Sequence, residues 1–290
     1  MSFSRRIAFA LATRESWERV VRAVPRGEDA AYRFASRYVA GTGLDDAVSC
    51  AERLAADGLA SSIDLFGEHV TDPAVADRVT DQYVLLAGSL SRFPRGTFLS
   101  IDLSHIGLDG SADATEQRLR RIAEALPPGC RLQVGAEEEA RAEVILAVVL
   151  AVARACGGVS ASLQANLKRS PRDVRTLAHA GVPVRLVKGA YVESASVALP
   201  WGDPTDLAFM ELAHELRRSG VEVVLATHDP VLREALLTAL PGVGVEMLLG
   251  VRGDDARELA ARGVPVRIYV PYGADWFRYA MRRFAESLGH

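Results

Sequence analysis

The chain has 290 residues, of which 49% are hydrophobic and 24% are charged, and its formal net charge is −3. This length and apolar content suffice for one large core, such as an α/β barrel of roughly 200–250 residues or more. The slightly acidic balance argues against a nucleic-acid partner, because such proteins usually present a basic patch.

The cysteines and the N-terminal segment indicate a cytoplasmic protein. Cys50, Cys130 and Cys156 lie far apart without a Cys-x-x-Cys, which suits a reducing compartment and argues against a disulfide framework. Arg5 and Arg6 precede an apolar run, as in an export signal, but the run spans only about seven residues, so we expect no secretory signal. No segment approaches the roughly 20 apolar residues of a membrane span, which leaves room only for peripheral membrane contact.

The order of the predicted elements indicates the fold. Residues 2–58 predict helices, because apolar residues recur at helical spacing in 30–39 and 44–54. After Gly58, short β-rich runs alternate with longer helical segments such as 140–155 and 206–218. The runs are 62–66, 98–103, 131–134, 159–164, 182–187, 221–226, 243–248 and 264–270.

Eight β units that alternate with helices predict a (β/α)₈ barrel of the TIM type over residues 59–290. Residues 1–58 would form an N-terminal helical arm that packs on the barrel or serves a subunit contact. A doubly wound sheet is the alternative, but it usually has fewer strands, and no Gly-x-Gly-x-x-Gly follows the first run.

Polar residues gather where the predicted strands end, which is where such barrels carry their chemistry. Arg185 lies inside an apolar strand, where an unpaired charge is unfavourable. The polar residues at the strand ends are Glu68, His69, Asp102, His105, Glu137, Gln164, Asn166, Lys188, Thr227, His228, Asp229 and Tyr269.

Two kinds of chemistry at these ends compete with a cofactor site. His69, His105 and His228 could converge on a metal, but no His-x-His or His-x-x-x-His is present, so we expect no metal. Lys188 could form a Schiff base, as in an aldolase-like lyase. However, Arg185, the glycine after Lys188 and the nearby histidine suit an anionic cofactor equally well, and on physical grounds both interpretations stay open.

The segment after the last strand predicts a turn followed by a helix. On a helix, Tyr279 lies one turn before Arg282 and Arg283, and Glu286 lies one turn after them. One surface would therefore offer a phenol, two guanidinium groups and a carboxylate. Paired guanidinium groups beside an aromatic ring suit a small molecule that bears a carboxylate.

Six motifs at these positions carry a family likeness. They are Leu-Phe-Gly-Glu at 65–68, Leu-Gln-Ala-Asn-Leu-Lys-Arg at 163–169, Arg-Leu-Val-Lys-Gly-Ala-Tyr at 185–191, Ala-Thr-His at 226–228, Tyr-Val-Pro-Tyr-Gly at 269–273 and Tyr-Ala-Met-Arg-Arg-Phe-Ala-Glu at 279–286. In this order they resemble the FAD-dependent proline dehydrogenases of the monofunctional bacterial type. The likeness extends from about residue 30 to the end of the chain.

The resemblance implies a barrel that binds FAD noncovalently and oxidises L-proline to Δ1-pyrroline-5-carboxylate by hydride transfer to flavin N5. It implies Arg185, Tyr269, Arg282, Arg283 and Asp102 as catalytic residues. It implies a substrate pocket formed by Tyr191, Leu248, Tyr279 and a gating Glu68. Cofactor contacts would come from Gln164, Arg185, Lys188, Gly189, Ala190, Thr227, His228 and Glu286.

Two departures from the family pattern affect the substrate side. The family has a lysine in its second strand where this chain has Asp102, and an aspartate in its third strand where this chain has Gly135. We expect Asp102 to replace part of the missing third-strand carboxylate. The same exchange could suit another cyclic amino acid, a proline derivative, or a noncatalytic barrel that only binds flavin. A quinone is the expected electron acceptor, with oxygen or a protein as alternatives, and the resemblance is compatible with a homo-oligomer.

Overall fold

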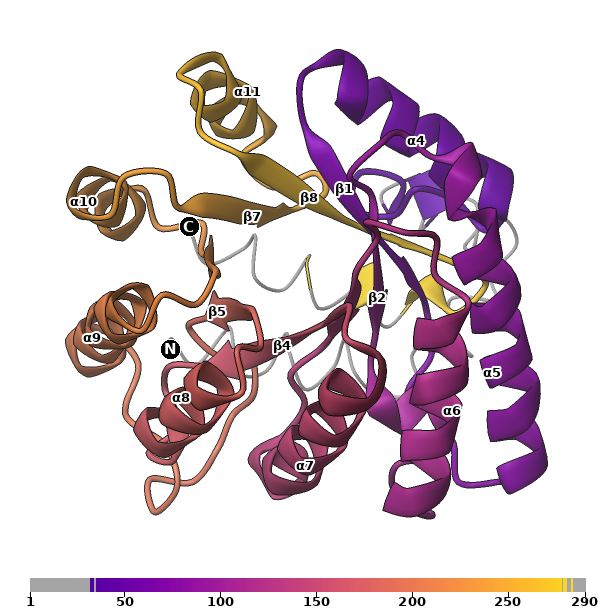
Figure 1. Cartoon of the computed structure of the whole chain (residues 1–290). Coiled ribbons are helices and arrows are strands. Elements are labelled where there is room, and N and C mark those ends of the chain that lie inside the picture. The colour runs from indigo at the N-terminus through magenta and orange to yellow at the C-terminus, as the bar shows by residue number, and fades with distance from the viewer. Residues whose placement is uncertain (1–31, 34, 278, 281–282, 284–290) are drawn as a thin grey trace.

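The computed structural model describes residues 32–33, 35–277, 279–280 and 283 of the chain. Helices surround a central set of strands in the view along the barrel axis (Figure 1). The strands are β1 Ala60–Leu65, β2 Phe98–Ile101, β3 Leu132–Val134, β4 Val159–Gln164, β5 Val184–Val187, β6 Val223–Ala226, β7 Gly244–Leu248 and β8 Val266–Tyr272.

The strands close into a barrel in chain order, and each neighbouring pair is parallel. Closure is made by β1 and β8, in which Ser62 lies beside Tyr269. The predicted (β/α)₈ barrel is therefore confirmed, and a doubly wound sheet is excluded because an open sheet would leave these two strands unpaired.

The helices fill the connections between strands. They are α4 Leu44–Ala56, α5 Pro73–Gly88, α6 Ala112–Glu124, α7 Glu139–Cys156, α8 Ser170–His179, α9 Asp203–Arg218, α10 Pro230–Ala239 and α11 Gly253–Ala261, with short 3₁₀ turns at Ser89–Arg92 and Leu103–Ile106. Among the helices of the described residues, none combines the length and the apolar composition that crossing a bilayer requires.

Two helices are capped by an aspartate that precedes a proline. The carboxylate of Asp72 accepts hydrogen bonds from the first backbone N–H groups of α5, and Asp229 does the same for α10. Proline is favoured next to such a cap because its ring sets a helical φ and its missing N–H is not needed there. These caps fix where the chain turns back at the carboxyl ends of the strands.

Side chains of each strand alternate between two environments. Ile63, Leu99 and Val245 are fully buried in the apolar layer between strands and helices. The alternate positions carry polar groups that meet across the barrel, since Gln133 of β3 and Arg185 of β5 both donate to Glu246 of β7. Strands that are not neighbours can only make such contacts through the barrel interior.

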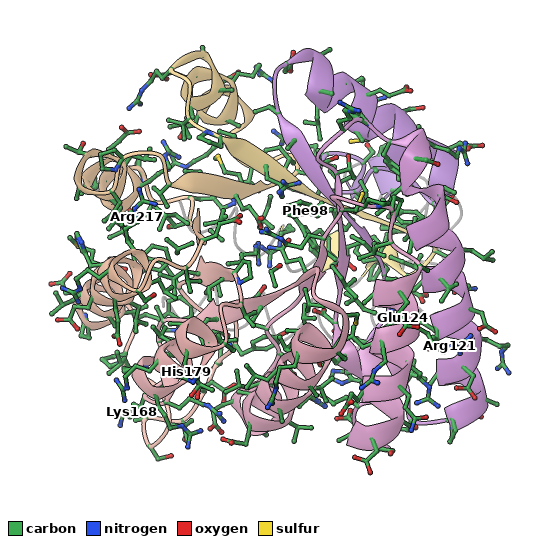
Figure 2. All side chains as sticks on the ribbon, in the orientation of Figure 1. Phe98, Arg121, Glu124, Lys168, His179 and Arg217 are labelled. Carbon is green, nitrogen blue, oxygen red and sulfur yellow. The ribbon has the colours of Figure 1, made fainter. Side chains whose placement is uncertain are left out.

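The amino ends of the strands are closed by a stacked plug. The guanidinium of Arg267 lies 3.4 Å from the ring centroid of Phe98, and that of Arg131 lies 5.0 Å from it. Phe98 accordingly lies near the centre of the barrel, whereas Arg121, Lys168 and Arg217 lie at the periphery (Figure 2). This end of the barrel is therefore filled by paired side chains.

The described part of the N-terminal arm packs on the barrel. Ala40 N donates to the carbonyl of Pro271 at 2.9 Å, and Gly273 N donates to the carbonyl of Gly41 at 3.0 Å. Helix α4 lies outside β1 (Figure 1) and buries Ala47 in the same core as the strands. The predicted helices of residues 1–31 lie outside the described residues.

Candidate active site

The amide of Gln164 links two loops at the carboxyl end of the barrel. Its Nε2 donates to the carbonyl of Glu137 at 2.8 Å, and its Oε1 accepts from Ala190 N at 3.3 Å. Gln164 ends β4, and the two loops follow β3 and β5. These two bonds hold the Gln164 amide in one orientation between the loops.

Gly189 lets the side chain of Asn166 pack directly against the backbone. Its φ is +128°, and a Cβ at this position would lie 2.2 Å from Oδ1 of Asn166. Asn166 is 2% exposed, and its Oδ1 has no hydrogen-bond partner among the described residues. This amide oxygen is a suitable acceptor for a ligand at the opening.

Lys188 forms ion pairs with two carboxylates. Its Nζ lies 2.5 Å from Asp206 Oδ1 and 3.1 Å from Asp229 Oδ2. Both partners stabilise the ammonium form, whereas a Schiff-base lysine must become a neutral amine. The geometry therefore favours charge pairing over Schiff-base chemistry at this residue.

His228 is held as a neutral imidazole in a positive environment. Its Nε2 accepts from Leu248 N at 3.2 Å, so the proton of the neutral ring lies on Nδ1, and this buried nitrogen has no partner among the described residues. Burial and, to a smaller extent, nearby guanidinium groups lower the pKa of His228 to about 4. Those groups belong to Arg283, Arg252, Arg233 and Arg185.

Aromatic rings form a wall beside the guanidinium of Arg283. Tyr279 lies 6.2 Å from Tyr269 and 5.2 Å from Phe66, measured between ring centroids. The guanidinium carbon of Arg283 lies 5.3 Å from the Tyr279 ring centroid. The predicted association of Tyr269, Tyr279 and Arg283 is thus present, while Arg282 and Glu286 lie outside the described residues.

The remaining predicted residues lie in the loops around the same opening. Glu68 follows β1 and is half-buried, Tyr191 follows β5, and Leu248 ends β7. Thr227 is 4% exposed, and its hydroxyl accepts from Asp229 N at 3.2 Å. No described contact tests the gating role expected of Glu68.

Asp102 occupies the space that a side chain at position 135 would need. A Cβ added to Gly135 would lie 1.8 Å from Oδ1 of Asp102 and 3.1 Å from its Cγ. The two residues follow β2 and β3, which are neighbouring strands. The second-strand carboxylate therefore lies where a third-strand side chain would lie, as the expected exchange requires.

Comparison with known proteins decides the family. A family model described as "Proline dehydrogenase" matches residues 47–288. The chain belongs to the proline dehydrogenase family.

Individual relatives agree with this assignment. The chain is 34% identical over 260 residues to "Proline dehydrogenase 1" of Bacillus subtilis strain 168, covering 87% of this chain and 86% of the relative. It is 31% identical over 269 residues to "Proline dehydrogenase" of Deinococcus radiodurans, covering 88% and 87% of the two chains. The alignments thus span both partners nearly in full.

Solved structures share the fold. Proline utilization A from Bdellovibrio bacteriovorus, inactivated by N-propargylglycine, superposes with a TM-score of 0.78 at 18% identity over 88% of this chain and 33% of that chain. Proline utilization A from Bradyrhizobium japonicum, in a D778Y mutant, gives 0.74 at 20% identity over 88% and 31%. The chain spans about a third of the length of these structures, and the likeness concerns the fold alone.

Membership of the proline dehydrogenase family implies a flavin cofactor, and the residues at the opening fit one. The unpaired Nδ1–H of His228 can donate to an acceptor, and the arginines around it favour a ligand with negative charge. Asn166 adds an amide acceptor. No group of three or more His, Cys, Asp or Glu residues in the described part of the chain could hold a metal.

Sequence reasoning missed Asp64, which lies beneath the aromatic wall. Tyr269 Oη donates to its Oδ2, and Tyr83 Oη donates to its Oδ1 at 3.4 Å. Burial raises the pKa of Asp64 to about 6, against the opposing effect of these hydrogen bonds and of the Arg185 charge. An aspartate inside the apolar run 62–66 was the available signal.

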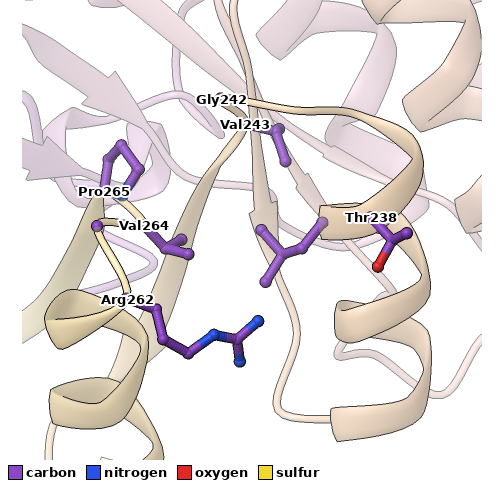
Figure 3. Close-up of a pocket in the computed structure, with 8 residues that line it drawn as sticks. Thr238, Gly242, Val243, Arg262, Val264 and Pro265 are labelled. Atoms are coloured by element: carbon purple, nitrogen blue, oxygen red, sulfur yellow. The ribbon is translucent and has the colours of Figure 1, made fainter.

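A cavity at the opposite end of the barrel is a poor alternative site. It measures about 260 Å³ and lies between the loops that precede β7 and β8 (Figure 3). Its one charged lining residue, Arg262, already forms two hydrogen bonds with Glu234 at 3.1 and 2.8 Å. This cavity therefore gives no reason to move the candidate site of this proline dehydrogenase homologue away from the carboxyl end.

Proposed function

We propose that this protein binds FAD and oxidises L-proline to Δ1-pyrroline-5-carboxylate. The observation that carries the proposal is the position of Arg283 beside the wall formed by Tyr269 and Tyr279, with His228 under the positive charge of Arg283 and Arg185. Family membership supplies the reaction class, an oxidoreductase that acts on a CH–NH donor.

The cofactor would be held by residues from three neighbouring strands. Gln164, Gly189 and Ala190 would contact the ring system of the flavin. The hydrogen bond from Ala190 N to the Gln164 amide holds this stretch of backbone in place. Lys188, Thr227 and His228 would bind the ribityl and pyrophosphate groups, with Glu286 as a further contact. Arg185 would lie near flavin N5, where a guanidinium stabilises negative charge on a reduced ring.

The substrate would be oriented by its carboxylate. Arg282 and Arg283 would form a bidentate clamp, and such a clamp fixes position as well as charge. Tyr191, Leu248, Tyr269 and Tyr279 would enclose the ring of proline and exclude water. Glu68 would close over the substrate by pairing with one of the arginines. FAD would supply the hydride acceptor for the carbon next to the amine, the amine proton would leave to solvent, and a quinone would take up the two electrons.

The placement of Asp102 supports a second candidate substrate. Its carboxylate lies in the space above Gly135, where it would add negative charge on the substrate side of the opening. A cyclic amino acid with an additional amine, or a proline derivative, would pair with this carboxylate better than proline does.

Anaerobic reduction of the purified protein tests the proposal. We expect a yellow protein whose flavin absorbance is bleached by L-proline. Faster bleaching by ornithine-like or N-substituted analogues than by L-proline would favour the second candidate substrate. A yellow protein that no amine bleaches would indicate a flavin-binding module. A colourless protein that borohydride traps with a carbonyl substrate would return the assignment to Schiff-base chemistry at Lys188.

A further inference from the structure

Glu246 is a buried carboxylate that reaches Arg185 from across the barrel interior. It lies on β7, its side chain is 1% exposed, and its Oε2 accepts a hydrogen bond from Arg185 Nε. Arg185 itself is 18% exposed. The ion pair therefore has one member inside the barrel and one that reaches toward the opening.

Other side chains hold Glu246 in one position. Gln133 Nε2 donates to both of its carboxylate oxygens at 3.1 and 3.0 Å. Arg267 Nε lies 3.6 Å from its Oε1. Arg267 is fixed in turn, because it donates to the carbonyls of Ser61 and Gly96 at 2.7 and 2.6 Å and stacks on Phe98. A carboxylate with these partners is a fixed negative charge.

Only one edge of the Arg185 guanidinium is used by this contact. A guanidinium has five N–H donors, and the bond to Glu246 uses the one on Nε. The charge of Arg185 acts on Asp64 and on His228, which belong to the carboxyl end of the barrel. The same guanidinium therefore binds Glu246 on its inner side and contributes positive charge at the carboxyl end of the barrel.

We propose that Glu246 is a positioning residue which orients Arg185 and weakens the positive potential that Arg185 presents to the flavin. The inference rests on the proposed function, because it needs a flavin above Arg185. A carboxylate bonded to the far side of a guanidinium reduces the net charge seen from the near side. Glu246 would thus make the bound flavin harder to reduce than Arg185 alone would.

Glu246→Gln separates charge from shape. A glutamine oxygen in the place of Oε2 can still accept from Arg185 and Gln133, while one negative charge is lost. Sulfite is a direct probe, because it adds to flavin N5 and leaves negative charge on the ring. We expect the sulfite dissociation constant to fall about tenfold and the flavin midpoint potential to rise by about 30 mV, the equivalent for a two-electron couple.

Two further variants distinguish charge from packing. Glu246→Asp keeps the charge but shortens the side chain, so its sulfite affinity should stay near that of the wild type. Glu246→Met also removes the charge and should give the same rise in midpoint potential. This variant keeps the test valid if the glutamine variant does not fold. Glu222→Gln is the matched control, since it removes one carboxylate from the Arg131 pair at the amino end.

Unchanged sulfite affinity and midpoint potential in the neutral variants would overturn the inference. So would an aspartate variant that behaves like glutamine, because packing would then explain both. Failure of the proposed substrate is separable: a wild-type flavin that binds sulfite but is not bleached by L-proline leaves the comparison of variants intact. A wild-type protein without flavin would overturn both proposals.

Discussion

The two ends of the barrel use similar residues in opposite ways. At the amino end, Arg131 donates to both oxygens of Glu222 at 2.7 and 2.9 Å, and Arg267 has carbonyl partners and a ring beneath it. At the carboxyl end, one buried nitrogen of His228 has no partner in the part of the chain that the structure describes, and the charges of several guanidinium groups act on this ring. Arginines are present at both ends, so residue type alone does not mark the site.

The difference lies in how completely the polar groups are satisfied. Buried polar groups are nearly always hydrogen-bonded, and an unpaired one in a native fold calls for an explanation. At the amino end, the guanidinium groups have carboxylate, carbonyl and aromatic partners, which is typical of a structural plug. At the carboxyl end, the open donor of His228 and the open acceptor of Asn166 are partners for a ligand.

The largest expected effect comes from removing one arginine at each end. Arg185→Met should lower kcat/KM for L-proline by about 10²- to 10³-fold, the usual loss when a group that stabilises developing charge is deleted. Arg131→Met should leave kcat/KM unchanged and lower the free energy of unfolding by less than about 1 kcal/mol, since its pair with Glu222 is partly exposed. Steady-state kinetics with denaturant titrations measure both. Equal kinetic losses at the two ends would break the comparison.

A smaller effect is expected in the pH dependence of the free energy of unfolding, to which His228 contributes. Its pKa is about 4 in the folded chain and 6.5 in the unfolded chain. Between these values the unfolded chain binds a proton that the folded chain does not, so the free energy of unfolding falls as the pH falls. From pH 7 to pH 5 the wild type should lose roughly 1–2 kcal/mol more than His228→Gln, because one pKa unit corresponds to about 1.4 kcal/mol.

Denaturant titrations of the two proteins at both pH values measure this difference. Asp64 and His105 also have shifted pKa values, but they are present in both proteins and cancel in the comparison. A wild type and variant with the same pH dependence would show that His228 is not held as a neutral imidazole.

The fold could be predicted from the sequence because local and global signals agree. Short apolar runs that alternate with helical segments match all eight strands, and the differences are confined to strand ends, as in 182–187 against Val184–Val187. The residues directly after strands, such as Lys188 and His228, could also be placed, because parallel strands bring their carboxyl ends together.

The barrel interior could not be predicted in the same way. Polar residues alternate with apolar ones in these strands, so the periodicity separates the two faces but does not say which polar residues meet across the barrel. Glu246 and Gln133 were therefore passed over, although the bond from Arg185 to Glu246, which Gln133 also holds, explains how a charge is tolerated inside a strand. The alternation was the available signal, and the pairing itself depends on the closure of the barrel.

The smallest expected effect sharpens the comparison at the carboxyl end itself. Gly135→Ala places a methyl group 1.8 Å from the present position of Asp102 Oδ1, so it should lower the free energy of unfolding by about 1 kcal/mol or more. In an Asp102→Ala background the same substitution should be nearly neutral, which corresponds to a coupling energy of about 0.5–3 kcal/mol. Denaturant titrations of the four proteins measure that coupling.

Gly88→Ala is the matched control for this cycle. Gly88 ends α5, and a Cβ there would meet nothing within 4 Å, so alanine should be neutral or slightly stabilising in both backgrounds. Additive effects of Gly135→Ala and Asp102→Ala would mean that the Asp102 carboxylate does not lie over Gly135. The second-strand aspartate could then not replace a third-strand carboxylate, and the case for a substrate other than L-proline would lose its structural basis.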